Sequence, residues 1–162
     1  MTTPKFHPDF HAFIESLTRH GVRFLIVGAH AMAYHGRPRE TDDLDVFVAP
    51  SIENANAVAT ALRDFGGYDT VAELAETHLA DPDRIVTLGR PPIAIDIITS
   101  ISAVSFDDAF ARRIEDEIDR LVIPFIALSD FVVNKKASGR PKDRSDLTLL
   151  AEAGIIDEED AK

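Results

Sequence analysis

The sequence contains neither cysteine nor tryptophan, and it has few basic residues. Without cysteine the chain can form no disulfide, no thiolate nucleophile and no cysteine-ligated zinc or iron–sulfur site. Lysine and arginine together number 17 against 28 aspartate and glutamate residues, which gives a net charge of −11. A surface of that sign repels nucleic acid on average, because binding to phosphates requires clustered cations. We therefore expect nucleic acid only as an acceptor at a local basic pocket.

Long apolar runs are also absent from the sequence. No stretch approaches 18 consecutive apolar residues, so we expect no membrane span. Residues 1–5 lack the apolar segment of a signal peptide, and a cytoplasmic location is the resulting expectation. The length of 162 residues and the 45% hydrophobic content predict a single globular domain over residues 1–162. Residues 156–162 are expected to form a solvated acidic tail.

Hydrophobic periodicity predicts alternating helices and strands. Helices are expected over 10–17, 29–34, 51–65, 71–79, 106–112, 129–138 and 143–150, and strands over 23–28, 43–48, 84–88, 93–98, 113–119 and 121–127. Pro124 places its strand at an edge of the sheet, and Ser129 is expected to cap the following helix. This order predicts a mixed α/β (α+β) fold in which one mixed sheet is flanked by helices.

Aspartates occur on two of the predicted strands. Asp43 and Asp45 are two residues apart and therefore project to the same face, whereas Leu44 and its alternate neighbours point into the core. Asp96 lies in the middle of an apolar strand, where a carboxylate is costly to bury without compensation. If the two strands are neighbours, the three carboxylates converge and repel one another.

A divalent cation would reverse that repulsion. Oxygen ligands without histidine or cysteine favour Mg²⁺ or Mn²⁺, and such a site suits in-line transfer at phosphorus. In the alternative interpretation, Asp43 and Asp45 lie on a solvated edge and Asp96 pairs with an internal arginine. An Asp-x-Asp strand together with a second mid-strand aspartate favours the metal site.

Two further segments carry candidate binding residues. Gly28 and Ala29 lie where a strand gives way to a helix, a position where the backbone can approach phosphate closely. Near the C-terminus, Asp143 and Asp146 share a helical stripe with leucines, so these inward-facing carboxylates need partners, and Lys135 or Arg140 are the nearest. The basic residues there either hold a helix–helix junction through ion pairs or place a lysine over a triphosphate. Both interpretations remain open.

These motifs resemble a known family. The segments 27–29 and 39–46 (Arg-Glu-Thr-Asp-Asp-Leu-Asp-Val) are similar to the signature of the nucleotidyltransferase superfamily with the DNA polymerase β-type fold. In that signature a glycine turn is followed by Asp-x-Asp and by a third aspartate on a later strand. Residues 134–147 resemble the C-terminal helical motif of small bacterial members, the AbiEii-like or minimal nucleotidyltransferases, some of which occur in toxin–antitoxin operons. The resemblance spans about residues 10–150.

The resemblance implies a role for each matching residue. Asp43, Asp45 and Asp96 would be the catalytic carboxylates and the metal ligands, with Asp96 as the base. Nucleotide binding would involve the residues Gly28, Ala29, Arg39, Thr41, Lys135 and Arg140. Ala29 stands where many active relatives have serine or glycine, so a side-chain contact to phosphate is lost while the backbone donor remains. No separate substrate-binding domain is expected.

The leading functional hypothesis is a Mg²⁺-dependent (or Mn²⁺-dependent) nucleotidyltransferase. It would move NMP from an NTP to a hydroxyl of a protein, an RNA or a small molecule, within or outside a toxin–antitoxin system. The second hypothesis is a non-catalytic module of the same fold that pairs with a cognate protein partner, whose basic surface would complement the −11 charge. A metal-dependent phosphohydrolase is the third. The identity of the acceptor does not follow from the sequence.

Overall fold

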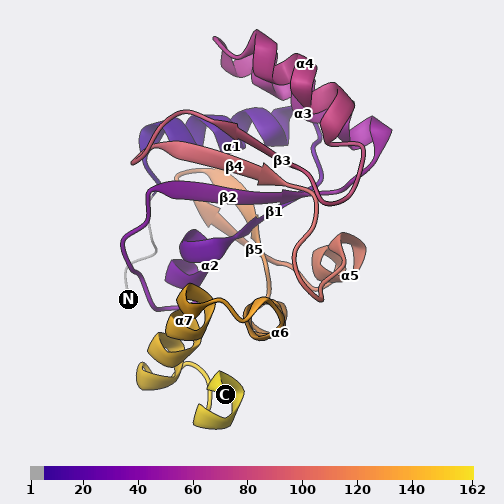
Figure 1. Cartoon of the computed structure of the whole chain (residues 1–162). Helices are drawn as coiled ribbons and strands as arrows, with labels where there is room; N and C mark the ends of the chain where they lie inside the picture. Colours follow the sequence, from indigo (N-terminus) through magenta and orange to yellow (C-terminus); the bar gives the residue numbers. More distant parts are fainter. Residues whose placement is uncertain (1–5) are drawn as a thin grey trace.

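A six-stranded sheet organises the chain, for which a computed structural model describes residues 6–162 (Figure 1). Residues 1–5, where we expected no signal peptide, lie outside the described residues. The strands are β1 (Phe24–Val27), β2 (Asp43–Val48), β3 (Ile85–Leu88), β4 (Ala94–Ile98), β5 (Ile114–Ile118) and β6 (Leu121–Phe125). They lie in the order β3-β4-β2-β1-β6-β5. The pairs β1/β6 and β2/β4 are parallel and the others antiparallel, so the predicted mixed sheet is confirmed.

Helices flank the sheet, as the sequence pattern predicts. They are α1 (Pro8–Arg19), α2 (Gly28–Tyr34), α3 (Ile52–Phe65), α4 (Asp69–His78), α5 (Phe106–Ala111), α6 (Leu128–Ser138), α7 (Pro141–Glu152) and the 3-10 helix η1 (Glu158–Ala161). Helices α6 and α7 lie together on the side of α2, away from α3 and α4 (Figure 1). None of the helices within residues 6–162 has both the length and the apolar character needed to cross a membrane.

The two faces of β2 serve different purposes. Leu44, Val46 and Val48 are fully buried in the main core cluster, together with apolar residues of α1 and α3. On the opposite face, Phe47 contacts Phe106 of α5 edge to face, with ring centroids 5.1 Å apart. Helix α5 therefore covers the end of this face and leaves the beginning of β2, where the aspartates lie, uncovered.

Two local predictions are wrong. Strand β6 lies between β1 and β5 rather than at an edge. Pro124 is tolerated there because β6 and β1 share one register pair, Ile26 with Phe125, so the ladder does not require an N–H group from Pro124. Helix α6 begins at Leu128 after Ala127, and no side chain caps it, so Ser129 lies inside the first turn instead of capping it.

The acidic tail is exposed, as expected, but it has regular structure. Residues Glu158–Ala161 form η1, which packs next to α7. Ile155 and Ile156 lie partly buried against the main core. The tail thus begins with an apolar anchor, and its carboxylates remain in solvent.

Candidate metal and nucleotide site

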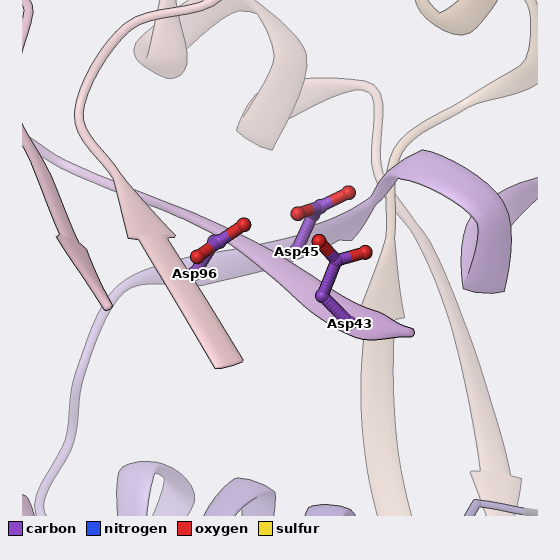
Figure 2. A group of neighbouring side chains, drawn as sticks. All are labelled: Asp43, Asp45 and Asp96. Carbon is purple, nitrogen blue, oxygen red and sulfur yellow. The ribbon is translucent and has the colours of Figure 1, made fainter. Parts of the chain in front are cut away.

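Three aspartates from two parallel strands converge on the open face of the sheet (Figure 2). Asp43 and Asp45 project from β2 and Asp96 projects from the neighbouring β4, where it lies in register with Asp45. One carboxylate oxygen of each residue lies within 4.8 Å of those of the other two. We call these residues the carboxylate triad.

The absence of a side chain at Gly28 leaves room for the carboxylate of Asp45. This glycine begins α2 directly after β1, and its φ of +65° lies in the left-handed region that favours glycine. A Cβ atom at this position would overlap the Oδ2 atom of Asp45. Glycine is therefore required here twice, once by its own backbone conformation and once by the close approach of the carboxylate.

Hydroxyl groups orient the other two members of the triad. The Thr41 hydroxyl lies 3.1 Å from Oδ1 of Asp43, within hydrogen-bonding distance, and also contacts the Asp43 backbone. On β3, the Thr87 hydroxyl donates to Oδ1 of Asp96 at 2.7 Å. Because each bond uses one carboxylate oxygen, the other oxygen of Asp43 and of Asp96 remains available to a ligand.

The triad is electrostatically strained without a bound cation. Burial, together with the negative charges of Asp43 and Asp96, raises the pKa of Asp45 to about 7. Lys142 and Lys135 oppose that rise, but they do not cancel it. None of the ion pairs among residues 6–162 includes a member of the triad. A clustered set of carboxylates without protein counter-charges fits a hard divalent cation such as Mg²⁺ or Mn²⁺.

A cavity of about 580 Å³ opens over the triad. Its lining includes four carboxylates and four cationic side chains. The lining residues are Val27, Gly28, Arg39, Asp43, Asp45, Asp83, Ile85, Asp96, Ile98, Ser100, Ile101, Ser102, Asn134, Lys135, Ser138, Arg140 and Lys142. The cavity is large enough for a small-molecule ligand.

Two further aspartates, Asp143 and Asp146, hold cationic side chains of the cavity wall in place. Lys135, almost fully buried, lies 3.1 Å from Asp143 and 3.0 Å from Asp146. Arg39 donates two hydrogen bonds to Asp146, at 2.7 and 3.1 Å, and Arg140 lies 2.9 Å from Asp143. We call these five residues the paired cluster. It links the segment before β2 to α6 and α7.

The pKa values of both aspartates of the paired cluster lie below the ordinary value. Burial by itself would raise the pKa of Asp143, but hydrogen bonds from Arg140, Ser138 and Lys135 outweigh it and hold that pKa well below its ordinary value. Burial acts in the same direction on Asp146, and hydrogen bonds from Arg39 and Lys135 again lower the pKa. These inward-facing carboxylates therefore have the cationic partners that their positions on α7 require.

The structure brings together most of the residues singled out in the sequence. Gly28, Arg39, Lys135 and Arg140 line the same cavity as the triad. Ala29 is buried and is not one of the residues that line the cavity. Thr41 is also absent from the lining, and its contact is with Asp43.

Other lining residues were missed by the sequence analysis as site residues. Lys142 lies close enough to Asp45 to lower the pKa of that carboxyl. The position of Lys142, two residues after Arg140, was the signal in the sequence that could have identified it as a site residue. Asp83, Ser100 and Ser102 carry no local pattern. The β2–β4 pairing brings Ser100 and Ser102 to the site, and the β3–β4 pairing brings Asp83.

The two histidines near the site have structural contacts. Nε2 of His35 lies 2.8 Å from the Ile126 carbonyl, and burial lowers the pKa of this ring. His30 stacks on Phe6 at 5.4 Å, and its buried Nδ1 atom has no hydrogen-bond partner in the part of the chain that the structure describes. Burial lowers the pKa of His30 as well. Neither ring lines the cavity.

Comparisons with known proteins show a matching family and a similar fold. A family model described as "Nucleotidyl transferase of unknown function (DUF2204)" matches residues 7–160. Among solved structures, the fold is similar to the crystal structure of a candidate nucleotidyltransferase from Thermotoga maritima, with a TM-score of 0.59 and 15% sequence identity. That similarity covers 89% of this chain and 91% of the other. A search of curated protein sequences finds no match.

Proposed function

Since the chain belongs to this nucleotidyltransferase family, we propose that it transfers a nucleoside monophosphate from an NTP to an acceptor hydroxyl and releases pyrophosphate. The observation that supports this proposal most directly is the convergence of Asp43, Asp45 and Asp96 beneath a cavity with a cationic wall. Phosphoryl and nucleotidyl transfer require little covalent participation by the protein, so positioning and charge stabilisation account for most of the catalysis.

The triad is the proposed binding site for Mg²⁺ or Mn²⁺. Bound by Asp43, Asp45 and Asp96, the cation would neutralise phosphate oxygens and lower the pKa of the acceptor hydroxyl. The fit rests on the donor set, which consists of hard oxygen atoms that have no cationic partner of their own. Thr41 and Thr87 hold two of the carboxylates in fixed orientations through hydrogen bonds.

The cationic wall is the proposed site for the triphosphate. Arg39, Lys135 and Arg140 line the cavity while the buried aspartates of the paired cluster fix their positions. Lys142 adds a fourth positive charge near Asp45. Gly28 exposes backbone to the same cavity, and the absence of a side chain there permits phosphate to approach closely.

Asp96 is the proposed acceptor of the proton that the attacking hydroxyl loses. The Thr87 hydroxyl donates to Oδ1 of Asp96 and holds the carboxylate in place. The finer resemblance to small toxin–antitoxin nucleotidyltransferases makes a hydroxyl on a cognate protein one candidate acceptor. In that case the partner and the substrate would be the same molecule.

The test is titration of the protein with an NTP in the presence and absence of Mg²⁺, by isothermal calorimetry. We expect Mg²⁺-dependent binding by the wild type and at least a tenfold loss of affinity in the double variant Asp43→Asn/Asp45→Asn. The matched control is Asp42→Asn. Asp42 directly precedes β2 and is exposed, but it does not line the cavity. Circular dichroism checks that each variant is folded. Equal binding by the wild type and the double variant would overturn the proposed site.

A further inference from the structure

The cations of the cavity all come from one part of its wall. Arg39, Lys135 and Arg140 are tied together through the paired cluster, and Lys142 follows Arg140 on α7. Arg39 precedes the start of β2 by four positions. We call this region the cationic end of the cavity.

The region beyond the other end of the paired strands has a different character. Strands β2 and β4 run parallel, from the pair Asp43–Ala94 to the pair Phe47–Ile98. Arg39 lies before the beginning of these strands, and Ser100 lies after their end. Asp83 meets Ser100 there, because the Asp83 N–H donates to the Ser100 hydroxyl at 2.9 Å. We call this region, which residues 83–85 and 98–102 form, the hairpin end.

No cavity-lining residue of the hairpin end is a cation. Its polar side chains are the hydroxyls of Ser100 and Ser102 and the exposed carboxylate of Asp83. That carboxylate forms no hydrogen bond or ion pair with any residue in 6–162, whereas Ile85 provides an apolar surface beside it. A carboxylate in a cavity without a partner from the protein can pair with a cationic group of a ligand.

In-line geometry decides which ligand occupies which end. In nucleotidyl transfer, the attacking oxygen and the leaving pyrophosphate lie on opposite sides of the α-phosphorus. The pyrophosphate carries most of the negative charge and belongs at the cationic end, so the acceptor must approach from the hairpin end. The nucleoside is attached at an equatorial position of the transition state and therefore leaves this axis free.

We propose that the hairpin end is the acceptor subsite and that Asp83 selects acceptors in which the reacting hydroxyl is accompanied by a positively charged amine. This inference rests on the proposed function. In the reaction, the acceptor oxygen forms a bond to the α-phosphorus, the bond from that phosphorus to the bridging oxygen of pyrophosphate breaks, and the hydroxyl proton passes to Asp96. Polyanionic acceptors such as RNA are disfavoured, because they would bring phosphates to a subsite whose cavity-lining residues include a carboxylate and no cation.

The amine can belong to a small molecule or to a protein, and matched pairs of acceptors distinguish these sources. One pair is glucosamine and glucose; the other is a serine-containing peptide with flanking lysines and the same peptide with the lysines acetylated. A short RNA with a free 3′ hydroxyl is the fifth acceptor. Transfer of label from an α-³²P-labelled NTP mixture with Mg²⁺ is measured for each.

The wild type should label the charged member of at least one pair with a kcat/KM about tenfold above that of its neutral partner, a difference of about 1.4 kcal/mol. In Asp83→Asn this ratio should fall to near 1, while Mg²⁺-dependent NTP binding remains at its wild-type value. The control Asp81→Asn removes an exposed carboxylate two residues earlier that does not line the cavity, and it should keep the tenfold ratio.

Three results would overturn the acceptor subsite while leaving the proposed function in place. They are preferential labelling of the RNA, equal labelling within both pairs, and the absence of labelled product from a protein that still binds NTP with Mg²⁺. Loss of that NTP binding in the wild type would instead overturn the proposed function itself. A ratio that survives in Asp83→Asn would remove the assigned role of this residue.

Discussion

The molecule contains two groups of inward-facing aspartates, and it provides counter-charges to only one of them. Asp143 and Asp146 are surrounded by Lys135, Arg39 and Arg140, and their pKa values lie below the ordinary range. The carboxylate triad forms no ion pair with any of residues 6–162, and the pKa of Asp45 is raised to about 7. Both groups consist of the same residue type, and Asp143 and Asp146 are fully buried while the members of the triad are partly buried. What distinguishes a structural acid from a candidate functional one is therefore whether the fold has already neutralised it.

The largest effect is expected from breaking the paired cluster. Asp146→Ala leaves the buried ammonium of Lys135 with one carboxylate partner and removes the carboxylate partner of Arg39, so the free energy of unfolding should fall by about 3–5 kcal/mol. Urea denaturation followed by circular dichroism measures the change. The control Asp107→Ala removes a carboxylate that is 83% exposed and paired with Arg23, and it should cost less than about 1 kcal/mol. Equal losses in the two variants would contradict the comparison.

The triad should respond in the opposite direction. The folded-state pKa of Asp45 lies above its ordinary value of 3.8, so the folded protein holds more protons than the unfolded chain between about pH 4 and 7. The contribution of Asp45 to stability is therefore present at low pH and is lost as the pH rises through about 7. Asp45→Asn removes this loss and should make the metal-free protein more stable than the wild type by about 1–3 kcal/mol at pH 8.

Urea denaturation in EDTA across pH 4–8 measures this difference. The stability advantage of Asp45→Asn should be small at pH 4, grow up to about pH 7 and then level off. An advantage that does not depend on pH, or a destabilised variant at pH 8, would show that the triad is not strained by its own charge. The same charge makes the affinity for Mg²⁺ increase with pH over this range.

The smallest effect is expected from the hydroxyls that orient the triad. Thr41→Val and Thr87→Val each remove one hydrogen bond to a carboxylate, worth about 1 kcal/mol, and should weaken Mg²⁺ binding about fivefold. Calorimetric titration with Mg²⁺ provides the affinities. Thr148→Val is the matched control, because its hydroxyl donates to the Arg144 carbonyl on an exposed helix face. Unchanged Mg²⁺ affinity in both threonine variants would show that these hydroxyls do not contribute to Mg²⁺ binding.

Much of this comparison could be predicted from the sequence where the signal is local. The alternation of Leu44 and Val46 with Asp43 and Asp45 predicts both the strand and the shared direction of the two carboxylates. The helical stripe predicts that Asp143 and Asp146 face inward, and it identifies Lys135 and Arg140 as partners. In each case the residues lie within a few positions of one another, so strand or helix geometry alone relates them.

Long-range relations were less accessible. The bond of Arg39 to Asp146 joins residues 107 positions apart, and no periodicity indicates it. Asp83 reaches the cavity because β3 pairs with β4, and nothing in its own neighbourhood marks it. Pro124 was placed at an edge because the sequence does not show how short the ladder between β6 and β1 is. Sheet order and ladder length are properties of the assembled fold rather than of any segment.

Because Arg39 and Asp146 are 107 positions apart, the bond between them can form only late in synthesis. The ribosome releases the chain from its N-terminus, so β2 and β4, with all three members of the triad, emerge before α7 is made. Arg39 has no partner from the paired cluster until Asp146 follows. A ribosome-bound chain that ends before residue 141 thus carries the acidic half of the site without its ordered basic half, and only translation of the last helix makes the two halves meet.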